Sequence, residues 1–386
     1  MGNAPRICLF TSLYLPSMGG VETYTASLAN ALAQMGQRPI VVACATHGPA
    51  GIEASGGIDV VRLPCRALLN GRYPVPKRDA EARELWEWLS GQPVGHIVVN
   101  TRFYPLSLAG LGFAQEKGIV PVLIEHGSAH LTMGSPLVDK GVQAVEHAMT
   151  RRCLRRPARY YAVSRKASAW LGHFGIESCG ELPNSIDADA YAAGASPRDF
   201  RSEFDLADGE LLAAFVGRLV PEKGVRAIVE AARLLEGEGV VLALAGDGPL
   251  RGEAERSEGG ALRLLGRLSR PDVAALLAQA DAMCLPSRSE GFATSLLEAA
   301  ACGTPSLVTN VGGTDELIPD PRFGTILPDA RPETLADALR RAKGDRAALA
   351  AQGANAAKRV REGFSWRKTA EKVIEACQAA QLSPAP

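Results

Sequence analysis

Two glutamates, Glu290 and Glu298, stand eight positions apart in the stretch S-E-G-F-A-T-S-L-L-E. A helix is predicted to begin between them, so that free backbone N–H groups near Ala293 and Thr294 can bind a phosphate. A carboxylate beside a phosphate repels it, and we therefore expect the two glutamates to contact sugar hydroxyls, with one polyol on each side of a diphosphate. On spacing alone, two solvated glutamates fit equally well.

Two cations form a second candidate pair. Arg218 and Lys223 stand five residues apart in G-R-L-V-P-E-K-G, between the apolar run Leu211–Val216 and a predicted helix from Val225 to Leu235. Two positive charges beside a helix N-terminus suit a diphosphate without help from a metal ion. From the spacing alone, two solvated loop cations are an equal alternative.

Parallel sheets must position these loops, because short apolar runs alternate with helix-forming stretches in both halves of the chain. The N-terminal strands are expected at Arg6–Thr11, Ile40–Ala43, Ile58–Arg62, His96–Asn100, Pro121–Ile124 and Tyr160–Ser164. The C-terminal ones are expected at Leu211–Val216, Val240–Ala245, Ala261–Leu265, Ala282–Leu285 and Ser306–Thr309. Neither half carries G-x-G-x-x-G, which argues against a dinucleotide-binding dehydrogenase.

The N-terminal half has its own candidates. Gly19 and Gly20 precede a helix expected from Val21 to Met35, and they would let a diphosphate approach the backbone. An ordinary flexible turn is the alternative that the residues alone favour. His126 follows the strand Pro121–Ile124, where open α/β sheets bind ligands, although a lone histidine is more often structural.

Composition sets the broad class. A chain of 386 residues with 46% hydrophobic residues and 40 glycines suits two α/β domains. Lys+Arg and Asp+Glu each total 42, so no overall charge favours nucleic acid. Eight scattered cysteines without C-x-x-C suggest reduced thiols in a cytosolic protein, and no apolar stretch is long enough to span a membrane.

Two further features carry open interpretations. The run from Met149 to Lys166 is basic and lacks acids, and its arginines at spacings of four are expected to stack along one helix face. That face is either simply solvated or attracts an anionic lipid surface or a phosphate-bearing acceptor through Arg151, Arg152, Arg155, Arg156 and Arg159. His130 lies four residues after His126, but no helix or carboxylate trio makes a metal site of this pair, and we expect no metal.

The stretch E-G-F-x-x-x-x-L-E-A-x-A-x-G-x-P, beginning at Glu290, resembles the signature of the family 4 glycosyltransferases. The likeness covers nearly the whole chain. It includes Gly-Gly-x-Glu at 19–22, the G-R-x-x-x-x-K-G loop, and P-N-S-I-D at 183–187, where Ser185 replaces the usual glycine and leaves the hinge geometry in question. The resemblance implies the GT-B fold, in which two Rossmann-like, doubly wound parallel-sheet domains face each other across a cleft.

Residue roles follow from this resemblance. It implies that Arg218 and Lys223 hold the donor diphosphate, that Glu290 faces the donor sugar, that Glu298 holds the ribose, and that His126 contacts the sugar. Glu22 and, more weakly, His126 are implied on the acceptor side. The implied donor-binding set, beyond the two cations and two glutamates, is Gly19, Gly20, Gly266, Arg267, Leu268, Gly291, Phe292, Ala293 and Thr294.

The implied domains are an acceptor-binding domain at 1–185, a donor domain at 186–362, and a last helix in 363–386 that crosses back to the N-terminal domain. The implied activity is retaining, metal-independent transfer of a hexosyl or N-acetylhexosaminyl unit from a nucleotide-diphosphate sugar, UDP slightly before GDP, to a hydroxyl acceptor in bacterial glycan or natural-product biosynthesis. A cytoplasmic protein, peripheral to the inner face of the membrane if the basic run binds lipid, fits this activity. A nucleotide-sugar epimerase and a non-catalytic nucleotide-sugar-binding protein are the alternatives. The acceptor and the oligomeric state stay open.

Overall fold

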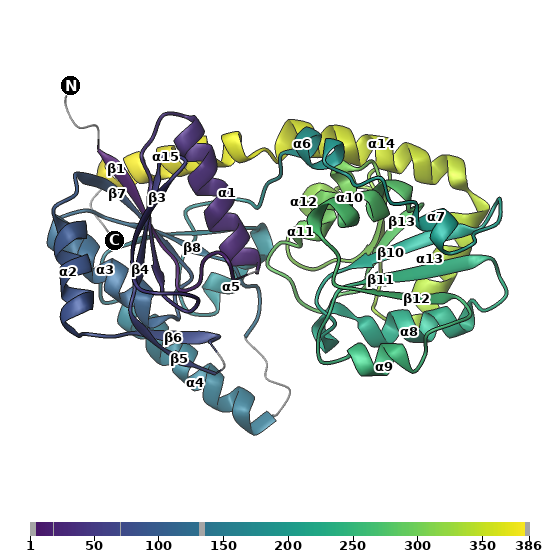
Figure 1. Cartoon of the computed structure of the whole chain (residues 1–386), viewed down its shortest axis with the longest axis horizontal. Coiled ribbons are helices and arrows are strands. Elements are labelled where there is room, and N and C mark those ends of the chain that lie inside the picture. Colours follow the sequence, from purple (N-terminus) through teal and green to yellow (C-terminus); the bar gives the residue numbers. More distant parts are fainter. Residues whose placement is uncertain (1–4, 18, 70, 131–135, 383–386) are drawn as a thin grey trace. The chain divides into compact units, whose positions relative to one another are not determined.

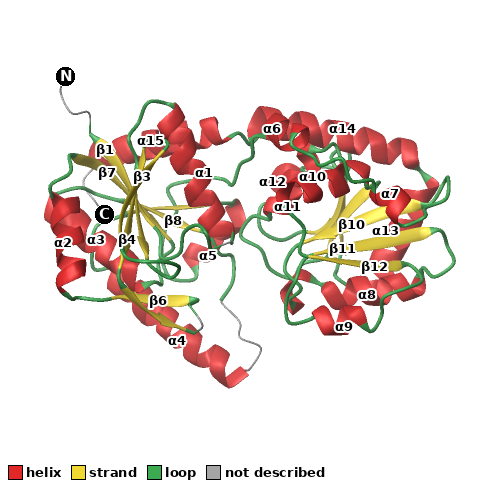
Figure 2. Cartoon of the chain, in the orientation of Figure 1, coloured by secondary structure: helices red, strands yellow, loops and turns green. Residues whose placement is uncertain are grey.

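The computed structural model describes residues 5–17, 19–69, 71–130 and 136–382. The chain divides into two compact units, residues 1–184 with 366–386, and residues 185–365 (Figure 1). Each unit is a sheet flanked by helices (Figure 2). The expected α/β class with two Rossmann-like domains is therefore confirmed.

The first unit is built on a seven-stranded sheet in the order β3-β4-β2-β1-β7-β8-β9, which is parallel except for β3 against β4. Without the edge strand β3, this order is that of nucleotide-binding doubly wound folds, with the switch in strand order between β1 and β7. The strands are β1 (Arg6–Phe10), β2 (Ile40–Cys44), β3 (Gly51–Ser55), β4 (Ile58–Leu63), β7 (Val94–Asn100), β8 (Val122–Glu125) and β9 (Arg159–Ala162), and a separate hairpin pairs β5 (Cys65–Leu68) with β6 (Tyr73–Pro76).

The helices of this unit are α1 (Gly20–Gln34), α2 (Ala80–Ser90), α3 (Pro105–Lys117), α4 (Pro136–Cys153), α5 (Arg165–Gly172) and the chain's last helix, α15 (Trp366–Leu382). The last helix packs on α1, β7 and β8, and Thr369 Oγ1 donates to the carbonyl of Pro183 at 3.2 Å. The final helix of the chain therefore completes the first unit.

The second unit has a fully parallel six-stranded sheet in the order β12-β11-β10-β13-β14-β15, so its switch point lies between β10 and β13. The strands are β10 (Leu211–Val216), β11 (Val240–Ala245), β12 (Leu262–Gly266), β13 (Ala282–Leu285), β14 (Ser306–Thr309) and β15 (Thr325–Leu327). β10, β11, β13 and β14 are apolar and almost wholly buried, as expected of strands covered on both faces.

The helices of the second unit are α6 (Ala188–Ala193), α7 (Phe200–Glu203), the 3₁₀ turn η1 (Pro221–Lys223), α8 (Val225–Leu234), α9 (Arg251–Glu255), α10 (Arg270–Gln279), α11 (Thr294–Ala301), α12 (Thr314–Leu317), α13 (Pro332–Gly344) and α14 (Arg346–Gly363). Five loops leave the carboxyl ends of β10 to β14 and lead toward these helices. That edge of the sheet carries the site.

One local expectation is wrong. α4 ends at Cys153, so Arg155 and Arg156 lie beyond it and do not stack on its face with Arg151 and Arg152. The thiol of Cys153 is buried against the carbonyl oxygen of Arg102 at 3.0 Å, and the chain turns at this point toward β9. The helix therefore stops where its last turn meets the core.

Candidate active site

Lys223 and Glu290 meet at the switch point of the second sheet. Lys223 ends the turn after β10, and Glu290 lies in the loop after β13. Lys223 Nζ donates to Glu290 Oε1 at 2.5 Å, and Ser287 Oγ donates to the same oxygen at 2.8 Å. Both charged side chains are largely buried, with 19% and 11% exposed. A cation and a carboxylate are thus fixed together where open α/β sheets bind ligands.

The loops after β10 and β13 approach each other too closely for a side chain between them. Gly224 has φ +73°, and a Cβ there would stand 2.2 Å from the carbonyl oxygen of Pro286. The backbone N–H of Arg288 also donates to the carbonyl of Glu222 at 2.7 Å. Glycine at this position therefore sets the distance between the lysine loop and the glutamate loop.

Arg218 has a different environment from Lys223. Its side chain is exposed, and its guanidinium makes no hydrogen bond or ion pair with another residue in the described ranges. The turn after β11 packs against the loop that carries Arg218. Leu219 N donates to Asp247 O at 2.9 Å, and a Cβ on Gly246 would meet the carbonyl oxygen of Gly217 at 1.8 Å. The turn after β11 is thus a support that leaves Arg218 available to an anion.

The loop from Gly291 to Thr294 presents backbone rather than large side chains. Phe292 is buried and its ring lies 5.6 Å from that of Phe364, while Ala293 is the buried N-cap of α11. A Cβ on Gly313 would meet the Phe292 ring at 2.1 Å, so the loop after β14 packs directly on this turn. The predicted contribution of Phe292 and Ala293 to ligand binding is therefore through their backbone.

Glu298 lies in the middle of α11, with its carboxyl group near Arg270 and the Tyr191 ring. Burial raises the pKa of Glu298 to about 6, and Arg270 opposes the shift. Arg270 begins α10, two residues after Leu268, the last of the three residues expected to meet the nucleotide base. Arg270 therefore brings Glu298 close to the loop Gly266–Leu268. Within this loop, Gly266 has a φ angle of +64°, which favours glycine.

In the first unit, the two glycines after β1 differ. Gly19 is the N-cap of α1, and the Glu22 carboxylate lies over it, because an added Cβ would stand 2.3 Å from Glu22 Oε2. Gly20 has open space where a side chain would be. Glu22 is itself buried, whereas Gly20 is exposed.

His126 stands directly after β8 and is held by three contacts. Its Nε2 lies 2.8 Å from Asn100 Oδ1, its ring makes an edge contact with Tyr24 at 4.8 Å, and its backbone N–H donates to Glu125 Oε1 at 3.1 Å. Burial lowers the pKa of His126 to about 3. The ring is therefore neutral at neutral pH, with Nε2–H donating to Asn100 and Nδ1 left as an acceptor.

Sequence reasoning missed three residues near these positions. Asn100 ends β7 and holds His126, and Tyr104 begins the turn into α3. The Tyr104 and Tyr73 rings stack at 5.4 Å, both half-exposed. Burial and the Glu22 charge raise the pKa of Tyr104 to about 12, while burial raises that of Tyr73 and Arg152 opposes it. Asn100 and Tyr104 could have been predicted as site residues from their positions at the end of β7 and just after it, because this strand lies at the switch point.

Family models match both halves of the chain. Residues 18–190 match the model "Glycosyltransferase Family 4", and residues 197–359 match "Glycosyl transferases group 1". The chain belongs to glycosyltransferase family 4. It is a retaining glycosyltransferase that transfers a sugar from a nucleotide-sugar donor, and the expected family and fold are confirmed.

This family 4 enzyme has full-length relatives. It is 26% identical to the D-inositol 3-phosphate glycosyltransferase of Arthrobacter sp. (strain FB24), over 94% of this chain and 90% of that protein. Sucrose-phosphate synthase from Thermosynechococcus elongatus has the same fold, with a TM-score of 0.76, 21% identity, and coverage of 98% of this chain and 100% of that one. HepE from Anabaena, solved with UDP-glucose, gives 0.73 at 18% identity, with coverage of 97% and 99%.

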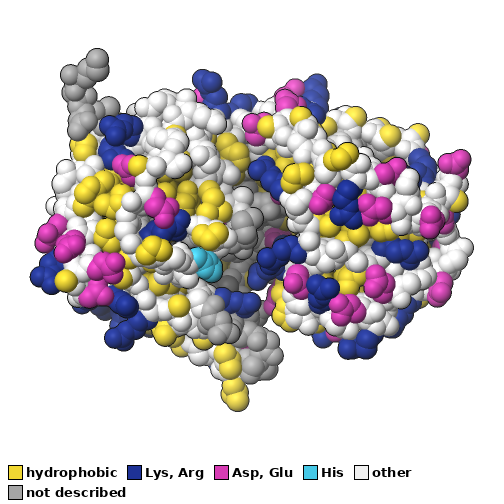
Figure 3. All heavy atoms as spheres, viewed as in Figure 1, with side chains coloured by type: hydrophobic (Ala, Val, Ile, Leu, Met, Phe, Trp, Pro, Cys, Tyr) yellow, Lys and Arg dark blue, Asp and Glu magenta, His cyan; other side chains and the backbone are white. Residues whose placement is uncertain are grey.

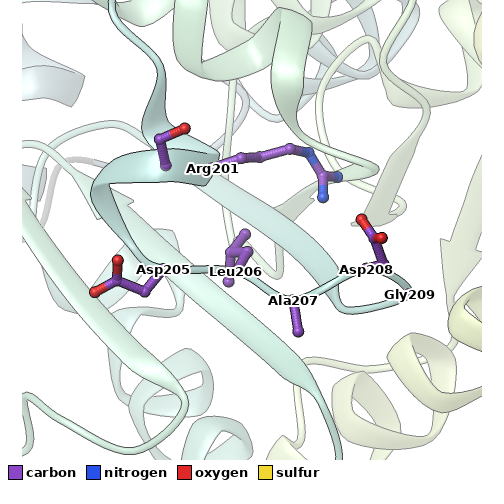
Figure 4. A pocket seen from close by; sticks show the side chains of 7 residues that line it. Arg201, Asp205, Leu206, Ala207, Asp208 and Gly209 are labelled. Atoms are coloured by element: carbon purple, nitrogen blue, oxygen red, sulfur yellow. The ribbon is translucent and has the colours of Figure 1, made fainter.

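The second unit also contains a pocket of about 410 Å³ (Figure 4). Its lining residues precede β10 and so stand at the opposite end of that strand from Arg218; they are Arg201, Ser202, Asp205, Leu206, Ala207, Asp208 and Gly209. Arg201, on its wall, already pairs with Asp281 at 2.6 Å. We assign the pocket no part in donor binding.

Charge is distributed without a single dominant sign. Acidic and basic side chains are interspersed over the visible face of the second unit (Figure 3). In the first unit, Arg151, Arg152 and Arg155 are exposed, whereas Arg156 and Arg159 are half-buried. The exposed basic surface is therefore smaller than the sequence suggested. Among the described residues, no helix is long and apolar enough to cross a membrane.

Proposed function

We propose that this glycosyltransferase moves a hexosyl unit from a UDP-sugar to a hydroxyl of a phosphate-bearing polyol. The ion pair of Lys223 and Glu290 at the switch point, with exposed Arg218 on the same loop as Lys223, is the observation that carries the proposal. Two cations match a diphosphate, and a glutamate held beside one of them matches the sugar attached to it.

The donor chemistry follows from these charges. Breaking the sugar–phosphate bond places negative charge on the leaving phosphate, and groups fixed before the reaction stabilise that charge best. Arg218, Lys223 and the N–H groups at the start of α11 would supply this stabilisation. Because two cations would already face the diphosphate, we expect transfer to proceed without added metal.

Retention needs no protein nucleophile on this scheme. The acceptor hydroxyl attacks the anomeric carbon from the face that the phosphate leaves, its oxygen forms the new bond, and its proton passes to a leaving-phosphate oxygen. Glu290 is held by Lys223 and Ser287 on one oxygen, which suits a group that orients the sugar. His126 is neutral, and its Nδ1 would accept a hydrogen bond from a sugar hydroxyl.

The acceptor class is proposed from residues of the first unit. Four side chains form a series of neighbours. The charge of Glu22 acts on Tyr104, and the Tyr104 ring stacks on that of Tyr73. The charge of Arg152 acts on Tyr73 in turn. A carboxylate can accept hydroxyls, an aromatic pair can cover a ring, and an exposed arginine can pair with a phosphate. The name of the Arthrobacter relative, which cites an inositol phosphate, supports the same class.

The donor base is proposed from a solved structure of the same fold. The loop expected to meet the base is Gly266–Leu268, and backbone contacts do not select one base. The Anabaena structure with UDP-glucose is the reason that we place UDP before GDP and ADP.

Thermal stabilisation by UDP, GDP and ADP, without metal, tests the donor site first, since a ligand that binds only the folded state raises Tm. We expect UDP to raise Tm most, and Arg218→Ala to abolish the rise. Product analysis with UDP-glucose and UDP-N-acetylglucosamine, offered with inositol phosphate or unphosphorylated inositol, then tests donor sugar and acceptor. Arg152→Ala should raise KM for the phosphorylated acceptor alone, with Arg151→Ala as control. Transfer to inositol at equal efficiency would contradict the phosphate assignment.

A lipid-linked acceptor is the second candidate, favoured by the surface of α4. Its side chains Leu137, Val138 and Val145 are exposed at 84%, 50% and 52%, and Arg151 and Arg152 lie in its last turn. A helix with exposed apolar and basic side chains is suited to bind an anionic membrane surface, such as a cytoplasmic leaflet. Cosedimentation with anionic but not zwitterionic vesicles, lost in Leu137→Glu, would support this candidate.

A further inference from the structure

Three histidines from separate elements of the first unit meet in one cluster. His130 follows β8, His147 lies on α4, and His173 caps α5. Their ligand atoms all lie within 4.8 Å of one another. The ring centroids are 5.5 Å apart for His130 and His147, 5.1 Å for His130 and His173, and 5.3 Å for His147 and His173.

These separations match those around a metal ion. A Zn–N bond of about 2.1 Å puts each imidazole centre about 3 Å from the metal, and tetrahedral angles then separate the centres by about 5 Å. The nitrogens must still approach one another by side-chain rotation. In the described part of the chain, the imidazoles of His147 and His173 are held by ring contacts rather than by hydrogen bonds. The His173 ring stacks on Trp170 at 4.7 Å, and the His147 ring lies 4.9 Å from Phe174.

The buried carboxylate of Glu146 fixes which ring nitrogen of His130 carries the proton. His130 Nδ1 lies 2.7 Å from Glu146 Oε2, with 5% of the Glu146 side chain exposed. Because a carboxylate only accepts, Nδ1 carries the proton and Nε2 carries the lone pair. Histidine ligands of metals have this arrangement, in which the other ring nitrogen donates to a carboxylate.

We propose that His130, His147 and His173 bind one divalent transition-metal ion, preferentially Zn²⁺, with Glu146 orienting His130. Imidazole nitrogens select Zn²⁺, Cu²⁺ or Ni²⁺ over Mg²⁺ or Ca²⁺. Three protein ligands leave one position for water, and His173 is exposed to solvent. None of these four residues is among those expected to bind the donor, so the proposal is compatible with metal-independent transfer.

The electrostatic surroundings favour a cation here. Arg102 is fully buried and pairs with both Glu125 and Glu146, which leaves one negative charge in excess in this group. A metal ion on His130 would supply the missing positive charge through the Glu146 contact.

The contacts of Glu146 and Arg102 also connect the histidine cluster to Glu125, at the end of β8, and through it to His126. Glu125 accepts from Arg102 and from the backbone N–H groups of His126 and Gly127, at 3.1 and 2.8 Å. The metal would therefore fasten the loop after β8 to α4 and α5, and would hold His126 in place through Glu146, Arg102 and Glu125. Its role is to position this loop.

The test uses the full chain without a polyhistidine tag, stripped with a chelator and titrated calorimetrically with ZnCl₂. We expect one Zn²⁺ per chain with submicromolar Kd and a higher Tm. His147→Ala and His173→Ala should each weaken binding by more than tenfold, and Glu146→Gln by about 10–100-fold, as for loss of a partner that orients a ligand. His173 is the least buried ligand, so its removal least threatens folding.

Two controls separate this site from other sources of binding. His47→Ala removes an exposed histidine outside the cluster, and Cys179→Ser removes the exposed thiol. Both should bind Zn²⁺ as the parent chain does. Cluster variants with parental affinity, or Kd above about 100 μM for the parent, would overturn the proposal and identify the histidines as an aromatic cluster with Trp170 and Phe174.

Discussion

Lys223 Nζ lies 2.5 Å from Glu290 Oε1, and this pair joins the loops that leave β10 and β13 on the two sides of the switch point. An ammonium group has three donors, so Lys223 can keep this contact and still donate to a phosphate. The pair thus fixes the distance between the group expected to hold the diphosphate and the group expected to hold the sugar.

Glu290→Gln should lower kcat/KM by about 10²–10³-fold, the cost of removing one preorganised polar group from a transition state. Affinity for UDP itself should change less than tenfold, since UDP carries no sugar to contact. Steady-state kinetics and UDP titration measure the two quantities separately. An equal loss in both would assign Glu290 to the nucleotide.

Arg218→Ala should weaken UDP binding and kcat together, because the guanidinium is expected to contact the diphosphate both before and during bond cleavage. Its side chain is exposed and its guanidinium makes no hydrogen bond or ion pair with another described residue, so Tm without ligand should stay unchanged. Arg226→Ala is the matched control, an exposed arginine of α8 that pairs with Glu253. Full activity of Arg218→Ala would overturn the diphosphate assignment.

Donor binding should depend on pH through Glu298. Its pKa in the free enzyme is raised to about 6, so the carboxylate that would accept ribose hydroxyls is lost as pH falls through that value. UDP affinity should therefore decline from pH 7.5 to pH 5 in the parent. Glu298→Gln should show lower affinity at pH 7.5 and a flatter profile, and a parental profile in this variant would contradict the assignment.

His126 should make the stability of the folded chain depend on pH. Its pKa is about 3 in the folded chain and about 6.5 when unfolded, so the unfolded state binds more protons between these values. This contribution to stability is present above pH 6.5 and is lost as pH falls toward 3. His126→Gln should reduce the acid-induced fall in Tm, whereas His47→Gln should not.

Much of the fold could be predicted because buried parallel strands are short apolar runs, and Arg218 and Glu290 follow two of them. β3 could not be found this way, because four of its five residues are exposed and carry no buried-strand pattern. Contacts between distant segments were also missed. Tyr104 and Arg152 are near Glu22 and Tyr73 only after folding, and the end of α4 depends on how Cys153 packs against Arg102.

The approach of the two donor-site loops can be tested with two glycines that share one backbone conformation. Gly224 has φ +73° and Gly237 has φ +75°, so alanine at either position bears a similar backbone cost of about 1–2 kcal/mol. Only at Gly224 would the new Cβ meet another loop, at 2.2 Å from Pro286 O, whereas at Gly237 nothing lies within 4 Å. Gly224→Ala should therefore lower the free energy of unfolding more than Gly237→Ala, as measured by denaturant titration. It should also raise KM for the donor, because the lysine and glutamate loops must separate. Equal losses of stability with unchanged KM would mean that the loops move apart without disturbing the pair of Lys223 and Glu290.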